Sequence, residues 1–360
     1  MKVQDLLNKK ILIQDLLIKF LDDDQIEENF LNLINIIETQ KIKNDKYELK
    51  QFLYLISHIT NNHYHSSYFF NKFEKILLHL KNAMTQYFTN DVIFNIFKKN
   101  KRILLFLFEE QILFMDKTIV NYFDINKNGS YDPYFLPEIR KYTKGPENDG
   151  DKIPDNFNVE REQGENNNYL CYLIRNDLID DFISYIGKSK IQLTSNVEYS
   201  IYETNNFLIK NKPLLIEYAA FYGSINILKY LHANGVELKP SLWIYVIHSN
   251  NLNLINFLEE NLALTDDKFI EQCLIESIKC HHNDIAKYLL ENIINRKDYH
   301  LIYEKSIKYY NFTFFPTNFN DDYLINFLCK YDHYIILKHI LASQKINIPK
   351  YLDFAKKINS

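Results

Sequence analysis

The feature that most constrains this fold is an order of residue types that returns along the second half of the chain. It is clearest over 214–236, where Ala219 and Ala220 are followed by Gly223, an apolar run and Gly235. Alanine lets two helices approach closely, and glycine permits the left-handed backbone that ends a helix. The block therefore predicts two short helices with Gly223 in the turn between them.

The same order recurs, with turn positions 27, 31 and 29 residues apart. After Gly223 these positions are Asn250, His281 and Tyr310, and Asp332 marks a final copy. Repeats of this length stack into arrays, because one pair of helices cannot bury its apolar face alone. The predicted fold class is all-α: a helical-repeat solenoid preceded by an N-terminal helical domain.

Residues 214–236 resemble an ankyrin (ANK) repeat. Taken with 204–213 and 275–286, they resemble a protist-expanded ankyrin family that carries a domain of unknown function. The resemblance covers most of 169–348 and, weakly, the N-terminal half. It implies degenerate ankyrin repeats and a protein-protein interaction role, with no assigned reaction, cofactor or catalytic residue.

Two departures from that family concern the hairpins between repeats. The copies are shorter than the standard repeat of about 33 residues. The best copy reads Leu-Leu-Ile-Glu over 214–217 where Thr-Pro-Leu-His is expected, and Pro213 stands two positions too early. We therefore expect shortened hairpins.

Composition supports helices and excludes one class of partner. The chain has 360 residues and is 46% hydrophobic, yet it contains only 7 Gly and 8 Pro. Sandwiches and barrels need turn residues every few positions, so long helices with short turns fit better. The net charge of −4 provides no basic field for phosphates, and we expect no nucleic-acid partner.

Periodicity and composition divide the chain into four regions. Residues 1–123 are predicted to form an N-terminal helical domain, with a weak ankyrin-like unit near 91–113. Residues 124–168 are predicted to form a flexible acidic linker, in which proteases should cut first at 145–151. The degenerate repeats occupy 169–348, and 349–360 is a C-terminal tail. Whether 1–123 packs as a separate bundle or continues the solenoid, and whether a capping repeat is missing, the sequence leaves open.

Nothing in the sequence predicts secretion or membrane insertion. The N-terminus lacks a basic stretch followed by an apolar block, and no apolar run approaches the length of a membrane span. The four cysteines contain no CxxC pair and are interpreted as reduced, mostly buried thiols. We expect a cytoplasmic protein with no membrane partner. A monomer is expected, with a dimer left open.

One segment resembles a calcium loop. From Asp124 to Asp132 oxygen ligands fall at positions one, three, five and nine of an EF-hand, with Gly129 at position six. However, Phe135 replaces the bidentate Glu, and Pro133 blocks the exiting helix. Turn chemistry explains the segment more simply, and no metal is predicted.

No other motif indicates chemistry. Cys273, Cys280, His281 and His282 form a Cys/His cluster, but they lack the closely paired ligands that structural zinc needs. The sequence contains no nucleophile elbow, zincin motif or glycine-rich phosphate loop. We therefore predict no catalytic residue, no cofactor and no small-molecule substrate.

The leading hypothesis is a non-enzymatic interaction module that uses the concave face of the solenoid, where first helices lie. Tyr and Trp are frequent interface hot spots, although Trp243 fits equally well as filler between repeats. Two alternatives stay open: a calcium-responsive regulatory protein acting through the Asp124–Asp132 loop, and an enzyme with no recognisable motif. The residues predicted to contact an unidentified protein partner are Phe221, Tyr222, Trp243, Tyr245, His248 and Lys279.

Overall fold

The computed structural model describes residues 3–23, 26–63, 69–124, 132–143, 154–262, 264, 266–294, 297–317, 319 and 322–344. In these ranges the regular structure is helical and contains no β-strand, which confirms the predicted all-α class. An isolated antiparallel bridge joins Asn196 and Leu214. None of the helices described combines the length and the apolar character that spanning a bilayer requires.

The chain divides into two compact units. The terminal unit takes the described residues of 1–63, 71–76 and 265–360, and the central unit those of 64–70 and 77–264. Helix α4 (Phe69–Tyr87) gives residues to both units. The terminal unit thus joins segments from the two ends of the chain, a grouping different from the predicted regions 1–123 and 169–348.

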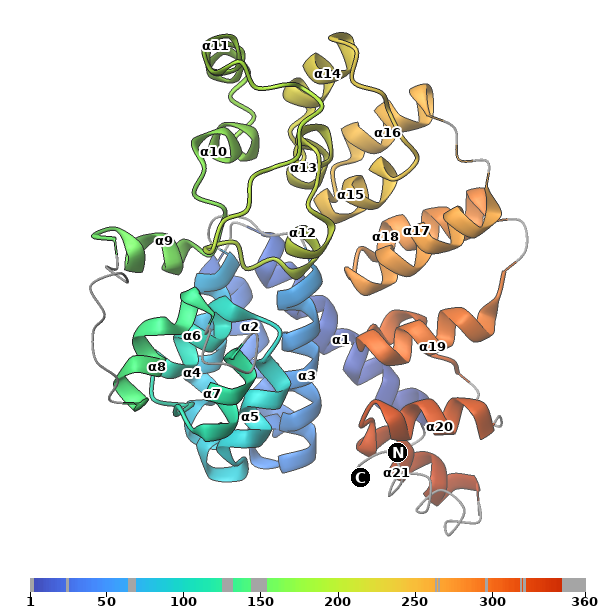
Figure 1. The fold of residues 1–360 in the computed structure, drawn as a ribbon. Coiled ribbons are helices and arrows are strands. Elements are labelled where there is room, and N and C mark those ends of the chain that lie inside the picture. The colour runs from blue at the N-terminus through green and yellow to red at the C-terminus, as the bar shows by residue number, and fades with distance from the viewer. Residues whose placement is uncertain are drawn as a thin grey trace. The chain divides into compact units, whose positions relative to one another are not determined.

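The central unit is a series of short helices (Figure 1, cyan to yellow). Within it α13 packs against α14 and α15, and α10 packs against α11 and α13. Asn and Asp cap several of these helices; for example, the Asn205 side chain accepts hydrogen bonds from two N–H groups of α12. Its helices after α4 are α5 (Asn90–Phe97), α6 (Lys101–Glu109), α7 (Lys117–Phe123), η2 (Pro133–Phe135), α8 (Leu136–Thr143), α9 (Phe157–Gln163), α10 (Tyr169–Arg175), α11 (Ile179–Ser189), α12 (Asn206–Asn211), α13 (Leu215–Tyr222), α14 (Ile225–Ala233), α15 (Leu242–Ser249) and α16 (Leu252–Asn261).

The terminal unit combines N-terminal helices with the last helix pairs (Figure 1, blue with orange and red). Helix α1 packs against α2, α21 and the short turn η4, and α3 packs against α21. The elements are α1 (Val3–Asp22), α2 (Ile26–Thr39), η1 (Ile42–Asn44), α3 (Lys46–Asn62), α17 (Asp267–Lys279), α18 (Asn283–Tyr288), η3 (Leu289–Ile293), α19 (Tyr299–Tyr309), η4 (Phe312–Phe314), α20 (Asp322–Lys330) and α21 (Tyr334–Gln344).

One type of turn recurs between the paired helices. At Gly223 the backbone is left-handed, with φ 79°, and the next N–H donates to the Ala219 carbonyl at 2.9 Å. This arrangement satisfies carbonyls that a helix end otherwise leaves without partners. Asn250, His281 and Tyr310 are also left-handed, with φ of 50°, 59° and 58°, which confirms the predicted turn positions. The same backbone state occurs at Gln111, Asp177 and Asp332.

Side chains just after these turns tie one helix pair to the preceding pair. In the central unit the Ser224 hydroxyl donates to the Ile174 carbonyl, at the end of α10. In the terminal unit Asn311 donates to the Ile278 carbonyl at 2.9 Å, and the His333 Nε2 lies 2.7 Å from the Ile307 carbonyl. Because each bond meets the third residue before a turn, neighbouring pairs stack in one register.

The region predicted as a linker contributes to the core where it is described. Tyr134 and Phe135 are fully buried, and the Tyr134 hydroxyl donates to the Arg161 carbonyl at 2.7 Å. Arg161 in turn pairs with Glu138 at 2.8 Å. Residues 145–151, where proteolysis is predicted, lie outside the described residues.

Candidate binding surface

Most of the residues predicted to contact a partner are packed inside the central unit. Phe221, Trp243 and Tyr245 are only 3%, 4% and 6% exposed. The Phe221 ring stacks on Phe207, with centroids 5.9 Å apart, and the Trp243 indole N–H donates to the Leu262 carbonyl at 3.2 Å. Side chains so enclosed offer a partner little area, and here they pack neighbouring helices together. Binding of a partner by these three residues stays a prediction.

Tyr222 and His248 also lie against their own unit. The Tyr222 ring is half-buried, with the Arg175 guanidinium 5.9 Å from its centroid. His248 is 1% exposed, and its ring lies against those of Phe207 and Phe221, at 4.2 and 5.1 Å. Binding of a partner by these two residues stays a prediction.

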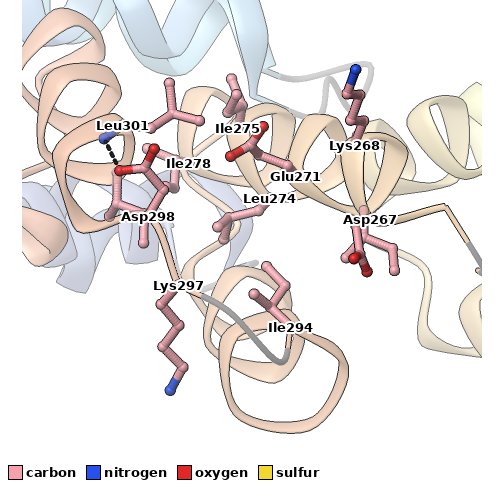
Figure 2. A pocket seen from close by; sticks show the side chains of 12 residues that line it. Asp267, Lys268, Glu271, Leu274, Ile275, Ile278, Ile294, Lys297, Asp298 and Leu301 are labelled. Carbon is pink, nitrogen blue, oxygen red and sulfur yellow. Dashed lines mark hydrogen bonds between the residues drawn. The ribbon is translucent and has the colours of Figure 1, made fainter.

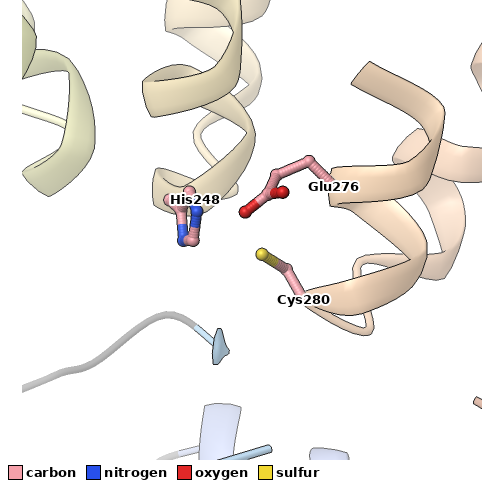
Figure 3. Close-up of side chains that lie close together, drawn as sticks. All are labelled: His248, Glu276 and Cys280. Atoms are coloured by element: carbon pink, nitrogen blue, oxygen red, sulfur yellow. The ribbon is translucent and has the colours of Figure 1, made fainter. Parts of the chain in front are cut away.

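Lys279, the sixth predicted contact, belongs to the terminal unit. Its ammonium pairs with Glu276 at 2.6 Å, one turn earlier on α17. Figure 3 draws Glu276 with Cys280, which follows the end of α17, and His248, which is described above with the central unit. Burial raises the pKa of the Cys280 thiol well above its usual value, so the thiol stays protonated. A protonated thiol is a poor nucleophile and a poor metal ligand.

The turns of the terminal unit are already covered by helix α3. Lys50 pairs with Asp332 at 2.5 Å, and the Tyr54 and His58 rings lie 5.5 and 5.3 Å from the Tyr310 ring. At the end of α3, the His63 Nδ1 lies 2.8 Å from the Cys280 carbonyl. Residues spaced about four apart share one face of a helix, so a single face of α3 meets three successive turns.

A groove of about 210 Å³ lies elsewhere in the terminal unit, between α17 and α19 (Figure 2). Figure 2 shows Leu274 of α17 and Ile294 beyond η3 pointing toward one another across it. The floor is apolar and the rim is charged. The apolar residues that line it are Ile270, Leu274, Ile275, Ile278, Ile294, Leu301 and Ile302, and the charged ones are Asp267, Lys268, Glu271, Lys297 and Asp298.

The rim charges differ in how they are used. Asp298 caps α19 by accepting a hydrogen bond from the Leu301 N–H at 3.1 Å. Glu271 is half-buried and makes no ion pair among the described residues. Lys268 and Lys297 are exposed. With three carboxylates and two ammonium groups, the rim carries a net negative charge.

Sequence reasoning missed this groove because its floor reads as ordinary core. Ile270, Leu274 and Ile278 recur four residues apart, the pattern of any buried helix stripe. That spacing alone does not show that a groove lies beside the stripe.

The loop with EF-hand spacing lies mainly outside the described residues, because only Asp124 and Asp132 of that segment are placed. The Asp132 carboxylate accepts a hydrogen bond from the Tyr134 N–H at 3.1 Å and pairs with Lys101 at 2.7 Å. Asp132 therefore already caps a helix and forms an ion pair, which agrees with the turn interpretation.

No family model, no curated protein and no solved structure matches the chain. The described residues define an all-helical protein in which left-handed turns recur between short helices.

Proposed function

We propose that the chain is a helical-repeat protein of ankyrin type that binds another protein without catalysing a reaction. The groove between α17 and α19 receives an apolar side chain of the partner, next to a basic one. The observation that carries the proposal is this apolar recess with a charged rim on consecutive helix pairs. Repeat proteins commonly bind their partners across such consecutive elements.

The size of the groove favours a side chain over a whole small molecule. Its volume of about 210 Å³ is below the roughly 300–1,000 Å³ of typical small-molecule pockets. Leu274, Ile278 and Ile302 are at most 5% exposed and give a largely pre-formed floor. Interface anchors fill recesses of this kind, surrounded by a polar rim.

The charge on the rim favours a basic neighbour beside that anchor. Glu271 is half-buried without an ion pair among the described residues, so a partner's Lys or Arg would gain a charge-assisted hydrogen bond there. Lys268 and Lys297 lie on the exposed rim and can hold acidic groups farther along the partner. The expected partner segment therefore carries a large apolar residue flanked by a basic one.

A photo-crosslinking amino acid in place of the exposed Lys268 would capture this partner from native cell extract, for identification by mass spectrometry. The captured protein is then purified, and its affinity is measured by calorimetry. Glu271→Lys should weaken binding by about tenfold, because it places like charges together. Glu260→Lys, at an exposed position of α16, is the matched control and should leave the affinity unchanged.

The proposal fails if the purified protein binds Glu271→Lys as tightly as the original chain. It also fails if a crosslinker at position 260 captures the same protein with equal yield. Both variants need unchanged thermal melting for the comparison to hold.

A further inference from the structure

A second cavity lies in the central unit, with a volume of about 390 Å³. Its lining comes from the segment between α11 and α12, from α12 and the residues that follow it, from Asn166 and from Tyr218 of α13. Val197, Leu208, Ile209 and Pro213 make part of this lining apolar. Glu198, Glu203 and Lys212 are its ionisable carboxylate and ammonium groups. The cavity therefore combines an apolar wall with a net negative charge.

Glu203 is the unusual member of this lining. It is 6% exposed, and its Oε1 accepts a hydrogen bond from the Asn205 N–H at 2.8 Å. Its Oε2 is buried and accepts no hydrogen bond of normal length among the described residues, although the Asn166 N–H lies near the carboxylate. Leaving a buried acceptor without a partner costs on the order of 1–3 kcal/mol, and more for a charged group. Glu203 lines the cavity, so a donor that reached this oxygen from there would remove that cost.

Arg175, the buried cation that acts on Glu203, has other hydrogen-bond and ion-pair partners. Arg175 pairs with Glu165 at 2.9 Å and donates to the Tyr218 hydroxyl at 3.0 Å. It also donates to the Asn166 carbonyl at 2.8 Å. Burial raises the pKa of Glu203 to about 7, against the lowering effects of the Asn205 and Asn166 N–H groups and of Arg175. The Glu203 carboxyl therefore lacks a cationic hydrogen-bond partner of its own.

We propose that this cavity binds a primary alkylammonium group, with the ammonium at Glu203 and the methylene chain along the apolar wall. Glu198, whose Oε2 already accepts from Asn168 at 3.1 Å, adds negative charge near the entrance. The Tyr199 ring is 71% exposed there and offers a face to a cation. A lysine side chain of a partner protein and a free alkylamine share this chemistry. The proposal stands independently of the groove in the terminal unit.

Calorimetric titration of the full chain tests it with three probes: n-butylammonium, N-acetyl-lysine-methylamide and the uncharged n-butanol. Both ammonium compounds should bind and n-butanol should not. The tighter of the two ammonium compounds identifies the source, a free amine or a lysine residue. Because only ionised Glu203 attracts the cation, the Kd should be about tenfold higher at pH 6 than at pH 8.

Glu203→Gln should abolish both the binding and its pH dependence. Glu237→Gln, an exposed position of the same unit, should change neither. Equal binding of n-butanol and n-butylammonium, or a Kd independent of pH, would overturn the proposal without any variant, so a folding failure of Glu203→Gln leaves it testable. Unchanged binding by a folded Glu203→Gln would also overturn it.

Discussion

The two units bury polar groups of opposite kinds. In the terminal unit the turns hold neutral histidines, and burial lowers the pKa of His281 and of His333 to about 3. In the central unit the buried acid Glu203 has its pKa raised to about 7. The two shifts make the stability of the units respond to pH in opposite directions. Through these groups, a falling pH should weaken the terminal unit and a rising pH the central unit.

The sign follows from proton uptake in the unfolded chain. For a buried neutral histidine the unfolded state binds the proton first, so stability is full above about pH 6.5 and falls as the pH drops toward 3. For Glu203 the folded state holds the proton more tightly. Its contribution is full below about pH 4.5 and is lost as the pH rises through 7.

The largest expected effect is acid loss of the terminal unit. At pH 4 each of the two histidines should cost roughly 3 kcal/mol relative to pH 7, since the unfolded chain takes up a proton that the folded one does not. Hydrogen exchange, corrected for intrinsic rates, should show α17, α19 and α21 losing protection. His333→Asn should reduce this loss of protection. His339→Asn, at a half-buried position of α21, should not reduce it. Equal loss in both variants would contradict this account.

The central unit should respond in the other direction. Between pH 5 and pH 8 the ionisation of Glu203 should cost the unit about 2.5 kcal/mol, visible as weaker exchange protection of α12 and α13. Glu203→Gln removes the titrating group and should flatten this dependence, whereas Glu237→Gln should keep it. A central unit that gains protection over the same range would show that Glu203 is ionised in a better-solvated state.

A bond that joins the ends of the chain gives a smaller effect, confined to one unit. Gln14 is fully buried on α1; its Oε1 accepts from the Phe312 N–H at 2.7 Å, and its Nε2 donates to Thr313 at 2.9 Å. Gln14→Ala leaves a buried N–H without its acceptor and should cost about 2 kcal/mol in the terminal unit alone. Denaturant unfolding measures this loss, and Gln4→Ala, at an exposed position of the same helix, is the control. Loss spread evenly over both units would argue against independent units.

Loss of a bond between helix pairs of the central unit should have a smaller effect. The Ser224 hydroxyl donates to the Ile174 carbonyl, and Ser224→Ala should cost about 1 kcal/mol, seen as faster exchange in α10 and α13. Ser195→Ala is a suitable comparison, because its hydroxyl bonds only within a local turn, to the Gln192 carbonyl. If both serines give the same loss, register bonds between helix pairs have no special weight.

The smallest effect concerns a turn residue. Asn250 holds a left-handed backbone with φ 50°, and Gly adopts that conformation without strain from a Cβ atom. Asn250→Gly should therefore raise the free energy of unfolding by a few tenths of a kcal/mol, seen as a slightly higher melting temperature. Gly223→Ala should do the reverse, since its φ is 79° and a new Cβ would lie 3.2 Å from the Asn251 amide nitrogen. Equal melting of the two variants would remove the steric argument.

Sequence reasoning reached the turns because their requirements are local. Each turn residue follows a short apolar helix and precedes another helix, and this order can be recognised within about thirty residues. The turn residues are Gly223, Asn250, His281 and Tyr310. The packing of α1 against η4 cannot be predicted from the sequence in this way. Gln14 and Asn311 are 297 positions apart, and an amide in a helix looks the same whether it meets solvent or a distant loop.

The candidate sites were missed for a similar reason. The sequence predicts contact residues on the concave face and leaves Trp243 open as filler between repeats. In the structure both Trp243 and Phe221 are buried. Glu203 gave no signal either, because nothing in its sequence neighbourhood distinguishes a buried carboxylate from a solvated one. Burial is a property of tertiary packing, so only the structure shows which of these groups are buried.

The most direct test of the interaction account is a hydrogen-exchange footprint of the full chain with and without the purified protein captured at position 268. The account predicts new protection in the first half of α17 and at the start of α19, with little change in α13 to α16. Protection confined to the central unit, or no protection at saturating partner, would contradict the assignment of the binding groove.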